Sequence, residues 1–359
     1  MRQWESVTVN REDSDLIQKM AEMAELHYGA KDDTAHAEYL AHEYFHDPAG
    51  DALIEIAWDR EKNRAAGQYI AIPIRVRIRG VDSSCLMSVN TLTREEYRGQ
   101  GIFTGLAAAV YERAAAKGYR LAYGMPNQHS YPGFVKALSF EDRGAVPLYL
   151  RPLRPSNLVR SYLKWNWAAA LASPFDPVFR MKEPGAVSVE KLTPENLELA
   201  DAFWKSVRDE YPVMICRDST YIRYRYLDIP RRKYQCFYAV EEGRPVAFAG
   251  GRVMEVANLQ CGMTADFLFL SGHEDAAWAV LRKLMFSLQQ EGADMIGCMT
   301  PPGSKETRLL RRHGFFKCPK AMEPQPFRFI LRILQSDDQA EDIKELKNWF
   351  FTMGDYDVV

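Results

Sequence analysis

The sequence predicts a mixed α and β fold built as two copies of one plan. Its 359 residues are enough for about two domains. The tyrosines, apolar positions and proline of residues 39–48 recur in register at residues 221–230. Each copy is followed by strand-like runs, then a helix, another strand and an ending with an aromatic residue, Phe140 in the first copy and Phe315 in the second. The shared order favours duplication over a chance similarity of two short tyrosine-rich segments.

The first copy contains a strand, a glycine-rich turn and an amphipathic helix in succession. Residues 86–92 have the composition of a strand. In residues 103–117 apolar side chains recur at spacings of three and four, and Gly118 supplies a helix stop. The turn at residues 98–101 lies between them. Because the first-turn amides of a helix lack intrahelical partners and carry the positive end of its dipole, we expect an anion at this turn.

The residue types of the turn suit a phosphate. Gly99 and Gly101 let the backbone approach an anion closely, and Arg98 can add charge-assisted hydrogen bonds. A strand-to-helix connection without a ligand is the alternative. The turn lacks both the P-loop pattern and the three-glycine fingerprint of dinucleotide folds, so nucleotide hydrolysis and hydride transfer are poor interpretations.

Two motifs carry a family resemblance. Arg98-x-x-Gly101-x-Phe103 follows a Ser-Val-Asn-Thr-Leu-Thr strand, and Lys136-Ala-Leu-Ser-Phe140 ends the next predicted helix. These motifs resemble the pyrophosphate loop and the "KLGF"-like ending of the GNAT superfamily of acyl-CoA N-acyltransferases. Phe103 stands where the usual Gln/Arg-x-x-Gly-x-Gly/Ala pattern has a small residue. Within the superfamily, the chain is most similar to multi-domain Eis-like acetyltransferases.

The resemblance implies an α+β fold of two tandem GNAT-like domains, each a twisted, mostly antiparallel sheet with helices on both faces. Two central strands would splay apart to admit the pantetheine arm of the coenzyme. The expected parts are an N-terminal acyl-CoA-binding GNAT domain (1–153), a connector (154–185), a C-terminal GNAT-like domain without a phosphate loop (186–335) and a tail (336–359). Where the first copy has its turn, the second carries Glu274 and Asp275, which oppose a phosphate. We therefore expect the coenzyme in the first copy only, with the second closing or lining the substrate cleft.

The same resemblance implies the substrates. Acetyl-CoA, or another acyl-CoA, would be the donor, and a primary amine of a small molecule or amino sugar the acceptor. The coenzyme-binding residues it implies are Leu92, Thr93, Arg98, Gly99, Gln100, Gly101, Ile102, Phe103, Thr104 and Asn127. Backbone N–H groups of residues 88–93 would stabilise the thioester oxygen. The alternatives are a longer acyl-CoA or acyl carrier protein donor, and a catalytically degenerate acyl-CoA-binding module.

Direct attack by an amine in a ternary complex benefits from a base, because an amine with a pKa near 10.4 is only about one part in a few thousand neutral at pH 7. Many GNAT enzymes carry a carboxylate on the strand before the loop, where this chain has Ser88 and Asn90. Asn90 can position a water molecule. The usual tyrosine acid falls at Val135, which leaves Tyr131 and His129 as candidates. A packing role for Tyr131 is equally compatible with the sequence, and a lone histidine is more often a surface residue.

The aromatic and acidic tail offers a second source for a base. Residues 348–359 are unusual for a chain end, where polar residues are common, so we expect them to pack onto a domain. In Eis-like proteins the C-terminal carboxylate enters the active site. The resemblance therefore makes Val359, Asp357 or Asp355 a candidate base.

The composition excludes some classes of partner. A net charge of −2 gives no global attraction to nucleic acid or to an anionic membrane. The six cysteines lack Cys-x-x-Cys pairs, which predicts reduced core residues in a cytoplasmic protein. No cysteine and histidine cluster has zinc-ligand spacing, so no metal is expected.

The first residues do not form an apolar signal segment. Residues 158–171 combine aromatic and basic side chains but are too short to span a bilayer, so no stable membrane insertion is expected. A connector packed between the domains is favoured there over an interfacial helix.

Overall fold

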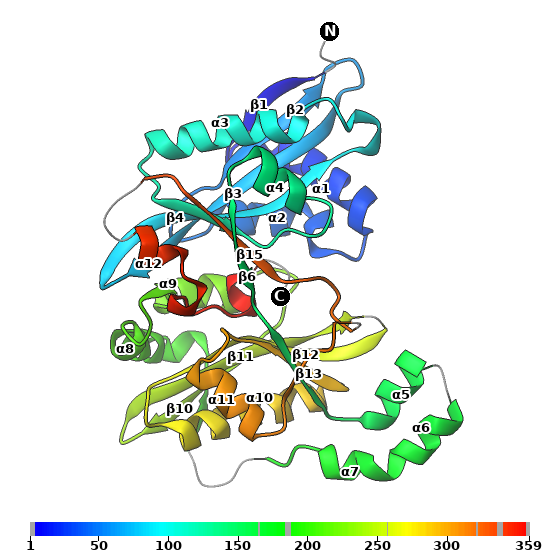
Figure 1. Cartoon of the computed structure of the whole chain (residues 1–359), viewed down its shortest axis with the longest axis vertical. Helices are drawn as coiled ribbons and strands as arrows, with labels where there is room; N and C mark the ends of the chain where they lie inside the picture. Colours follow the sequence, from blue (N-terminus) through cyan, green and yellow to red (C-terminus); the bar gives the residue numbers. More distant parts are fainter. Residues whose placement is uncertain are drawn as a thin grey trace. The chain divides into compact units, whose positions relative to one another are not determined.

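The computed structural model describes residues 4–163, 166–183, 188–256, 258–320, 322–335 and 340–356. The chain forms two compact units (Figure 1). Unit 1 comprises Met1–Ala145, Asp228–Arg231 and Phe327–Leu346, and unit 2 comprises Val146–Leu227, Arg232–Pro326 and Lys347–Val359. Each unit has one mostly antiparallel sheet with helices packed on it, which confirms the predicted α+β fold class.

Unit 1 is built on a sheet whose strands follow the order β1-β2-β3-β4-β5-β15-β6. The strands are β1 (Glu5–Val9), β2 (Leu53–Asp59), β3 (Arg64–Ile78), β4 (Val81–Thr93), β5 (Leu121–Gly124), β6 (Glu141–Ala145) and β15 (Arg328–Ile333). The helices are α1 (Ser14–Tyr28), η1 (Asp33–Ala35), α2 (Ala37–Phe45), η2 (Glu95–Tyr97), α3 (Ile102–Ala116), α4 (Tyr131–Ala137) and α12 (Ala340–Lys344). In this order β4 and β5 pair in parallel and the other neighbours are antiparallel.

Helices cover both faces of the unit 1 sheet. The helix predicted at residues 103–117 is α3, and its side chains at the three- and four-residue spacing pack with Ala66 of β3. The preceding residue of β3, Ala65, packs with Met23 and Ala24 of α1. Because successive side chains of a strand point to opposite faces, α3 and α1 lie on opposite sides of the sheet.

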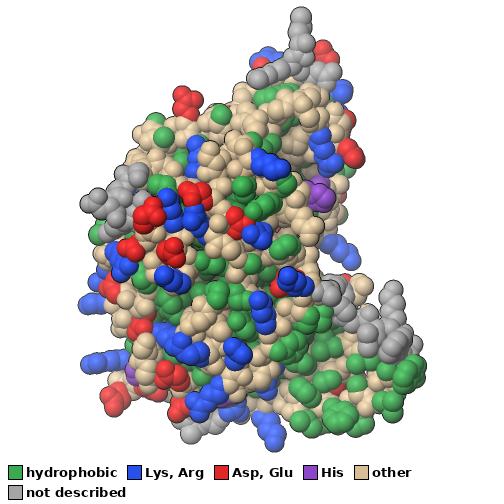
Figure 2. Space-filling model, viewed as in Figure 1, with side chains coloured by type: hydrophobic (Ala, Val, Ile, Leu, Met, Phe, Trp, Pro, Cys, Tyr) green, Lys and Arg blue, Asp and Glu red, His purple; other side chains and the backbone are tan. Residues whose placement is uncertain are grey.

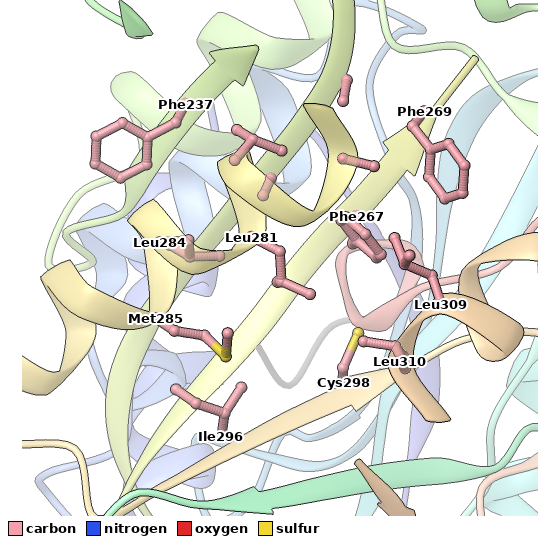
Figure 3. Close-up of a cluster of buried hydrophobic side chains, with 14 of the residues drawn as sticks. Phe237, Phe267, Phe269, Leu281, Leu284, Met285, Ile296, Cys298, Leu309 and Leu310 are labelled. Carbon is pink, nitrogen blue, oxygen red and sulfur yellow. The ribbon is translucent and has the colours of Figure 1, made fainter. Parts of the chain in front are cut away.

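Unit 2 has a sheet with the strand order β14-β7-β13-β12-β11-β10-β8. Its strands are β7 (Leu148–Pro152), β8 (Val189–Lys191), β10 (Gln235–Glu241), β11 (Arg244–Val256), β12 (Leu259–Phe269), β13 (Met295–Met299) and β14 (Phe316–Lys317). The residues of β9 (Val213–Ile215) belong to unit 2, but this strand is not part of that sheet. Its α-helices are α5 (Pro155–Leu163), α6 (Asn166–Ala172), α7 (Asp176–Phe179), α8 (Glu198–Val207), α9 (Ser219–Ile222), α10 (Glu274–Gln290) and α11 (Lys305–Arg312). The core forms where Leu281, Leu284 and Met285 of α10 pack toward Phe267 and Ile296 of the sheet (Figure 3).

The two sheets have the same strand order. Read from its other edge, the unit 2 sheet is β8-β10-β11-β12-β13-β7-β14, with the parallel pair β12 and β13 in the place of β4 and β5. In each of these two orders of seven strands, one strand comes from a distant part of the chain. β15 lies between β5 and β6, and β7 lies between β13 and β14. The repeat seen in the sequence thus corresponds to a shared topology in which each half contributes one strand to the other sheet.

This exchange makes the units differ from the predicted division of the chain. The sequence places residues 146–153 with the first domain and residues 327–335 with the second, whereas the strands formed there, β7 and β15, belong to the opposite sheets. The segment expected as a connector belongs to unit 2 and forms α5, α6 and α7. A short apolar strand carries no local signal that specifies its partner, because strand preference depends on the neighbours it packs against.

The structure bears on the expectations for the cysteines and for membrane-spanning segments. All six cysteines are buried thiols, as predicted, and burial raises the pKa of Cys261 to about 11. Within the described part of the chain, every helix is too short or too polar to cross a bilayer.

Candidate functional site

The glycine-rich turn joins η2 to α3 with both glycines in the left-handed region of backbone conformation. Gly99 has a φ of 77°, and Gly101, the N-cap of α3, has a φ of 74°. A Cβ added at Gly99 would meet no atom within 4 Å, and one at Gly101 would meet only Thr104 Oγ1, at 3.9 Å. The face of the turn is therefore open. An open turn that leads into the amides of a helix N-terminus fits a phosphate group.

The turn is held in place by the hairpin of β2 and β3. Tyr97 is buried, donates a hydrogen bond to the carboxylate of Asp59 and accepts one of 3.2 Å from Arg64 Nη2. The bond from Tyr97 lowers the pKa of Asp59, so the acceptor stays ionised. On the other side, Arg94 Nε donates to the carbonyl oxygen of Ala65 at 2.7 Å. These contacts fix the conformation of the turn at residues 98–101, here called the cradle, before any ligand binds.

Arg98 lies at the surface of the turn. Its Nη1 is 3.6 Å from Glu95 Oε1, and the two side chains are 59% and 87% exposed. An ion pair this exposed is worth at most about 1 kcal/mol, so Arg98 can exchange Glu95 for a phosphate at small cost. Gln100 is partly exposed beside it, and Thr104 Oγ1 donates to the carbonyl of Gly101 at 3.2 Å.

Phe103 points away from the open face of the turn. Its ring centroid lies 5.6 Å from that of Tyr69 and 5.2 Å from that of Phe134. A Cβ at Gly133 would lie 2.8 Å from Phe103 Cε1, closer than real Cβ contacts come. The absence of a side chain at Gly133 therefore makes room for the aromatic ring that replaces a small residue of the GNAT-like pattern.

Three of the predicted coenzyme-binding side chains make contacts within the protein. Leu92 is buried in a cluster with α1, and Ile102 is buried with its Cγ2 2.7 Å from where a Cβ of Gly67 would be. Only their backbone groups are available to a coenzyme. Asn127 Oδ1 accepts from the backbone N–H groups of His129 and Ser130, both at 3.0 Å, and so shapes the loop before α4. Thr93 is partly exposed at the end of β4.

The parallel pair β4 and β5 separates beside the turn. The pairing runs to Ser88 and Gly124, where β5 ends, while β4 continues to Thr93. The predicted splaying of the two central strands would begin beyond this last pair.

A β-bulge follows on the other edge of β4. Gln68 of β3 pairs with Leu92 and Ile70 pairs with Val89, so Asn90 and Thr91 together oppose one residue. Asn90 has a φ of 46°, which re-aims its side chain. The carbonyl of Asn90 accepts a hydrogen bond of 2.8 Å from Gln68 Nε2, which fixes the bulge.

The bulge directs Asn90 to a buried carboxylate that the sequence analysis missed. Asn90 Nδ2 donates to Tyr44 Oη at 3.0 Å and to Glu43 Oε2 at 3.3 Å. Glu43, on α2, is 6% exposed, and its Oε1 also accepts a hydrogen bond of 3.0 Å from Tyr39 Oη. A buried carboxylate beside a strand bulge is a candidate functional group. Its signal in the sequence is a glutamate four residues after Tyr39 in an otherwise apolar and aromatic helix.

The candidate acids lie on the loop and helix after β5. Tyr131 Oη donates to Asp142 Oδ2 at 2.5 Å, and this bond raises the pKa of Tyr131. Arg328 Nε donates to the same carboxylate oxygen at 2.5 Å. His129 is exposed. In the contacts of the described residues, neither candidate joins the group around Asn90. Val359 and Asp357 lie outside the described residues.

A depression of about 390 Å³ begins one helical turn from the glycines. It is lined by Thr104, Ala108, Tyr111, Glu112, Ala137, Leu138, Ser139 and Arg332. The Arg332 guanidinium lies 4.7 Å from the centre of the Tyr111 ring. The depression thus combines a cation, a hydroxyl group and apolar surface, and Thr104 belongs both to it and to the turn.

Unit 2 lacks an equivalent cradle at the corresponding place. The connection from β12 to α10 ends at the N-cap His273, and the first turn of the helix carries Glu274 and Asp275. Carboxylates at a helix N-terminus compete with a phosphate for the same amides. The acidic substitution predicted from the sequence is therefore present at the structural counterpart of the turn.

The chain's own C-terminal segment lies against β12. Arg217 pairs with Asp266 of β12 and with Asp355, each at 2.7 Å. A Cβ at Gly354 would lie 2.9 Å from the carbonyl oxygen of Ala265. At Ala265 the pairing of β12 with β11 shifts register, as the pairing of β4 with β3 does at its bulge. The tail packs onto a domain, as expected. Asp355 is committed to an ion pair and is not available as a base.

Comparisons with known proteins agree with this geometry. Residues 9–141 match the family model of the acetyltransferase (GNAT) domain. N-myristoyltransferase of Saccharomyces cerevisiae with bound myristoyl-CoA is similar with a TM-score of 0.67 at 10% identity, over 94% of this chain and 84% of that one. A probable N-acyltransferase of Enterococcus faecalis V583 gives 0.62 at 12% identity, over 93% and 73%. A GCN5-related N-acetyltransferase of Anabaena variabilis gives 0.59 at 12% identity, over 92% and 73%. None of the curated proteins matches the sequence.

At these identities the solved structures show a shared fold. The family model covers α1 to α4 together with the turn, so residues 9–141 match a GNAT acetyltransferase domain. The protein is an acyltransferase.

Proposed function

We propose that the protein transfers an acetyl group from acetyl-CoA to a primary amine of a small molecule, such as an amino sugar. The observation that carries this proposal is the open cradle of Gly99 and Gly101 at the N-terminus of α3. It stands beside the point where β4 and β5 separate. Such a cradle suits a pyrophosphate, and the separated strands suit the pantetheine arm.

The depression beside α3 is our proposed place for the adenosine end of the coenzyme. Thr104 connects it to the turn, so a molecule held by its pyrophosphate at the turn would extend into it. Arg332 supplies a positive charge for the 3′-phosphate and, with Tyr111, a flat surface for a base. The backbone amides at residues 98–104 would then hold the pyrophosphate.

A short acyl group is favoured by the packing under α3 and α4. Five aromatic side chains contact one another in a closed circle, with centroid distances of 5.1 to 5.9 Å between neighbours. They are Tyr69, Phe103, Phe134, Phe140 and Tyr111. These rings occupy the space on that face of the sheet. A longer acyl-CoA, as bound by the N-myristoyltransferase that the fold resembles, or an acyl carrier protein is the competing donor.

The proposal predicts that acetyl-CoA is the best donor in a series of acyl-CoA molecules of increasing chain length. Release of free coenzyme would be measured with acetyl-, octanoyl- and myristoyl-CoA against a panel of amino sugars and small amines. A higher kcat/KM for acetyl-CoA than for the longer donors supports the proposal. A preference for myristoyl-CoA contradicts it, and coenzyme binding without turnover of any amine assigns a degenerate binding module.

For the amine proton, we propose a path from the amine through a water molecule to Glu43. The side-chain NH2 group of Asn90 donates to Glu43 and Tyr44. Its side-chain oxygen, Oδ1, is therefore left to accept from the amine or the water. As the amine nitrogen bonds to the thioester carbon, its proton passes to the water and then to Glu43. The carbon–sulfur bond breaks, and backbone amides of β4 stabilise the oxygen meanwhile.

The departing thiolate also needs a proton. Tyr131 could supply one only after its hydroxyl leaves Asp142, and the raised pKa of that hydroxyl makes it a weaker acid than a free tyrosine. A thiolate with a pKa near 8.5 takes a proton from water readily at neutral pH. We therefore propose solvent as the proton source, with Tyr131 and the exposed His129 outside the chemical step.

Replacing Glu43 by glutamine is expected to lower kcat by about a hundredfold, the lower end of typical general-base contributions, with the KM for acetyl-CoA unchanged. The variant keeps the size of the side chain. Its amide oxygen can accept from Asn90 Nδ2 and its amide NH2 can donate to Tyr39 Oη, so folding is retained. Glu38→Gln is the matched control, because Glu38 is an exposed glutamate of the same helix.

The C-terminal carboxylate of Val359 is the competing base, implied by the likeness to Eis-like proteins. A chain that lacks residues 357–359 keeps Asp355, and with it the ion pair that holds the tail. If Glu43 is the base, this shortened chain keeps most of its kcat. Loss of turnover on shortening, together with full activity of Glu43→Gln, would assign the role to Val359 instead.

A further inference from the structure

Residues 155–163 and 166–179 form a helical arm of unit 2, made of α5, α6 and α7. Both of its ends are fixed. Asn157 Nδ2 donates to Asp294 Oδ1 at 2.7 Å, and just after the arm the backbone N–H of Met181 donates to Gln289 Oε1 at 2.9 Å. Ser156 Oγ donates to Asp176 Oδ2 at 2.6 Å, which joins the first helix of the arm to the last. The arm is therefore a folded element with a defined surface.

That surface is apolar. Trp167, Leu171, Phe175 and Val178 are 66%, 67%, 59% and 77% exposed. They are half of the eight large apolar side chains most exposed among the described residues, although they fall within one short stretch. Figure 2 shows hydrophobic side chains gathered over the arm, at the lower right of the view. Exposed apolar side chains scattered singly need no explanation, but a gathered patch marks a binding surface.

Basic side chains occur in the same segment as the patch. Arg160, Arg180 and Lys182 are exposed on the arm or directly after it. Glu183 pairs with Lys283, and Asp176, which accepts from the uncharged Ser156, carries less charge than these three cations together. The arm is thus locally positive in a chain whose net charge is −2. A patch with these two properties complements an anionic lipid surface, where apolar side chains enter the boundary of the acyl chains and basic ones meet the headgroups.

A second copy of the chain fits this surface less well. Two copies related by a two-fold axis would bring the same patch together, and with it the same basic side chains. Like charges would then face each other across the contact, which disfavours it. The arm is also too short to cross a bilayer, so its mode of binding is restricted to the surface.

We propose that the helical arm docks the protein on an anionic bilayer surface, with Trp167, Leu171, Phe175 and Val178 entering the interface. This assignment is independent of the acyl acceptor. It gives the protein a peripheral location on a membrane.

The test is binding of the full chain to vesicles of phosphatidylcholine with or without phosphatidylglycerol, measured by co-sedimentation. We expect binding to the vesicles that contain phosphatidylglycerol, and a weaker interaction at high salt. Phe175→Asp combined with Val178→Asp should lower the partition coefficient by about tenfold or more. Arg180→Gln should lower it by about fivefold, a factor that corresponds to about 1 kcal/mol per basic residue. Brominated lipids should quench the fluorescence of the full chain, and less so in Trp167→Phe.

Leu26→Asp is the matched control, because Leu26 is 72% exposed on α1, away from the arm in the sequence and in the other unit. It should bind vesicles as the native chain does. Failure of the full chain to bind either vesicle would overturn the proposal, as would equal binding of the native chain and the double aspartate variant. A dimer in light scattering that the double variant abolishes would assign the patch to a second copy instead. Acyl transfer to a soluble amine should be unchanged in the double variant, so this test stands apart from that of the enzymatic activity.

Discussion

Replacing Gly101 by valine is expected to weaken acetyl-CoA binding by about ten- to a hundredfold. Gly101 adopts a φ of 74°, and holding a non-glycine residue there costs about 1–3 kcal/mol, the most for a β-branched side chain. The turn relieves this strain by rotating away from the left-handed region, which turns its amides out of the cradle. Calorimetric titration with acetyl-CoA would measure the loss.

Gly118→Val is the control that separates strain from binding. Gly118 follows the other end of α3 with a φ of 79°, so valine imposes a similar strain on the same helix far along its axis from the turn. Both variants should lose similar thermal stability, while only Gly101→Val should lose affinity. Equal affinity of the native chain and Gly101→Val would refute the placement of the pyrophosphate at this turn.

The local parts of this site could be predicted from the sequence. Helix α3 follows from the spacing of its apolar residues, and the conformations of Gly99 and Gly101 follow from glycine being the residue that tolerates positive φ. These features depend on neighbours within one or two turns of the chain. The lack of a phosphate-binding turn in the second half can be predicted for the same reason, since Glu274 and Asp275 lie in the first turn of the helix.

The contacts that complete the site depend on residues far apart in the sequence. Glu43 meets Asn90 only because β4 bulges opposite β3 and α2 packs beside it, and no local pattern specifies either event. Tyr131 bonds to Asp142 because β6 runs next to β15, a strand that the chain supplies after passing through unit 2. A single sequence gives the composition of such strands but not their partners.

Replacing Arg217 by alanine is expected to destabilise unit 2 by about 3–5 kcal/mol. Arg217 is 1% exposed and binds the carboxylates of Asp266 and Asp355 as well as the carbonyl oxygen of Ile215. Without the guanidinium, two buried carboxylates face each other with no cation between them. Burial already raises the pKa of Asp355 in the native chain. Urea unfolding, followed through the tryptophans of unit 2, would measure the loss in free energy of unfolding.

The pH dependence of this loss has a defined sign. Asp355 binds its proton more tightly in the folded than in the unfolded chain, because burial disfavours its charge, and without the guanidinium this preference grows. The difference in stability between the native chain and Arg217→Ala should therefore be largest at neutral pH and shrink as the pH falls through the raised folded pKa of Asp355.

Two further variants decide whether the buried charges are the cause. Arg208→Ala removes an arginine that is 41% exposed and lies 3.7 Å from Asp209, so it should change the free energy of unfolding by less than about 1 kcal/mol. Asp266→Asn with Asp355→Asn in the Arg217→Ala background removes both uncompensated charges and should recover part of the stability. Equal stability of Arg217→Ala and Arg208→Ala would show that the tail is held on β12 by packing alone.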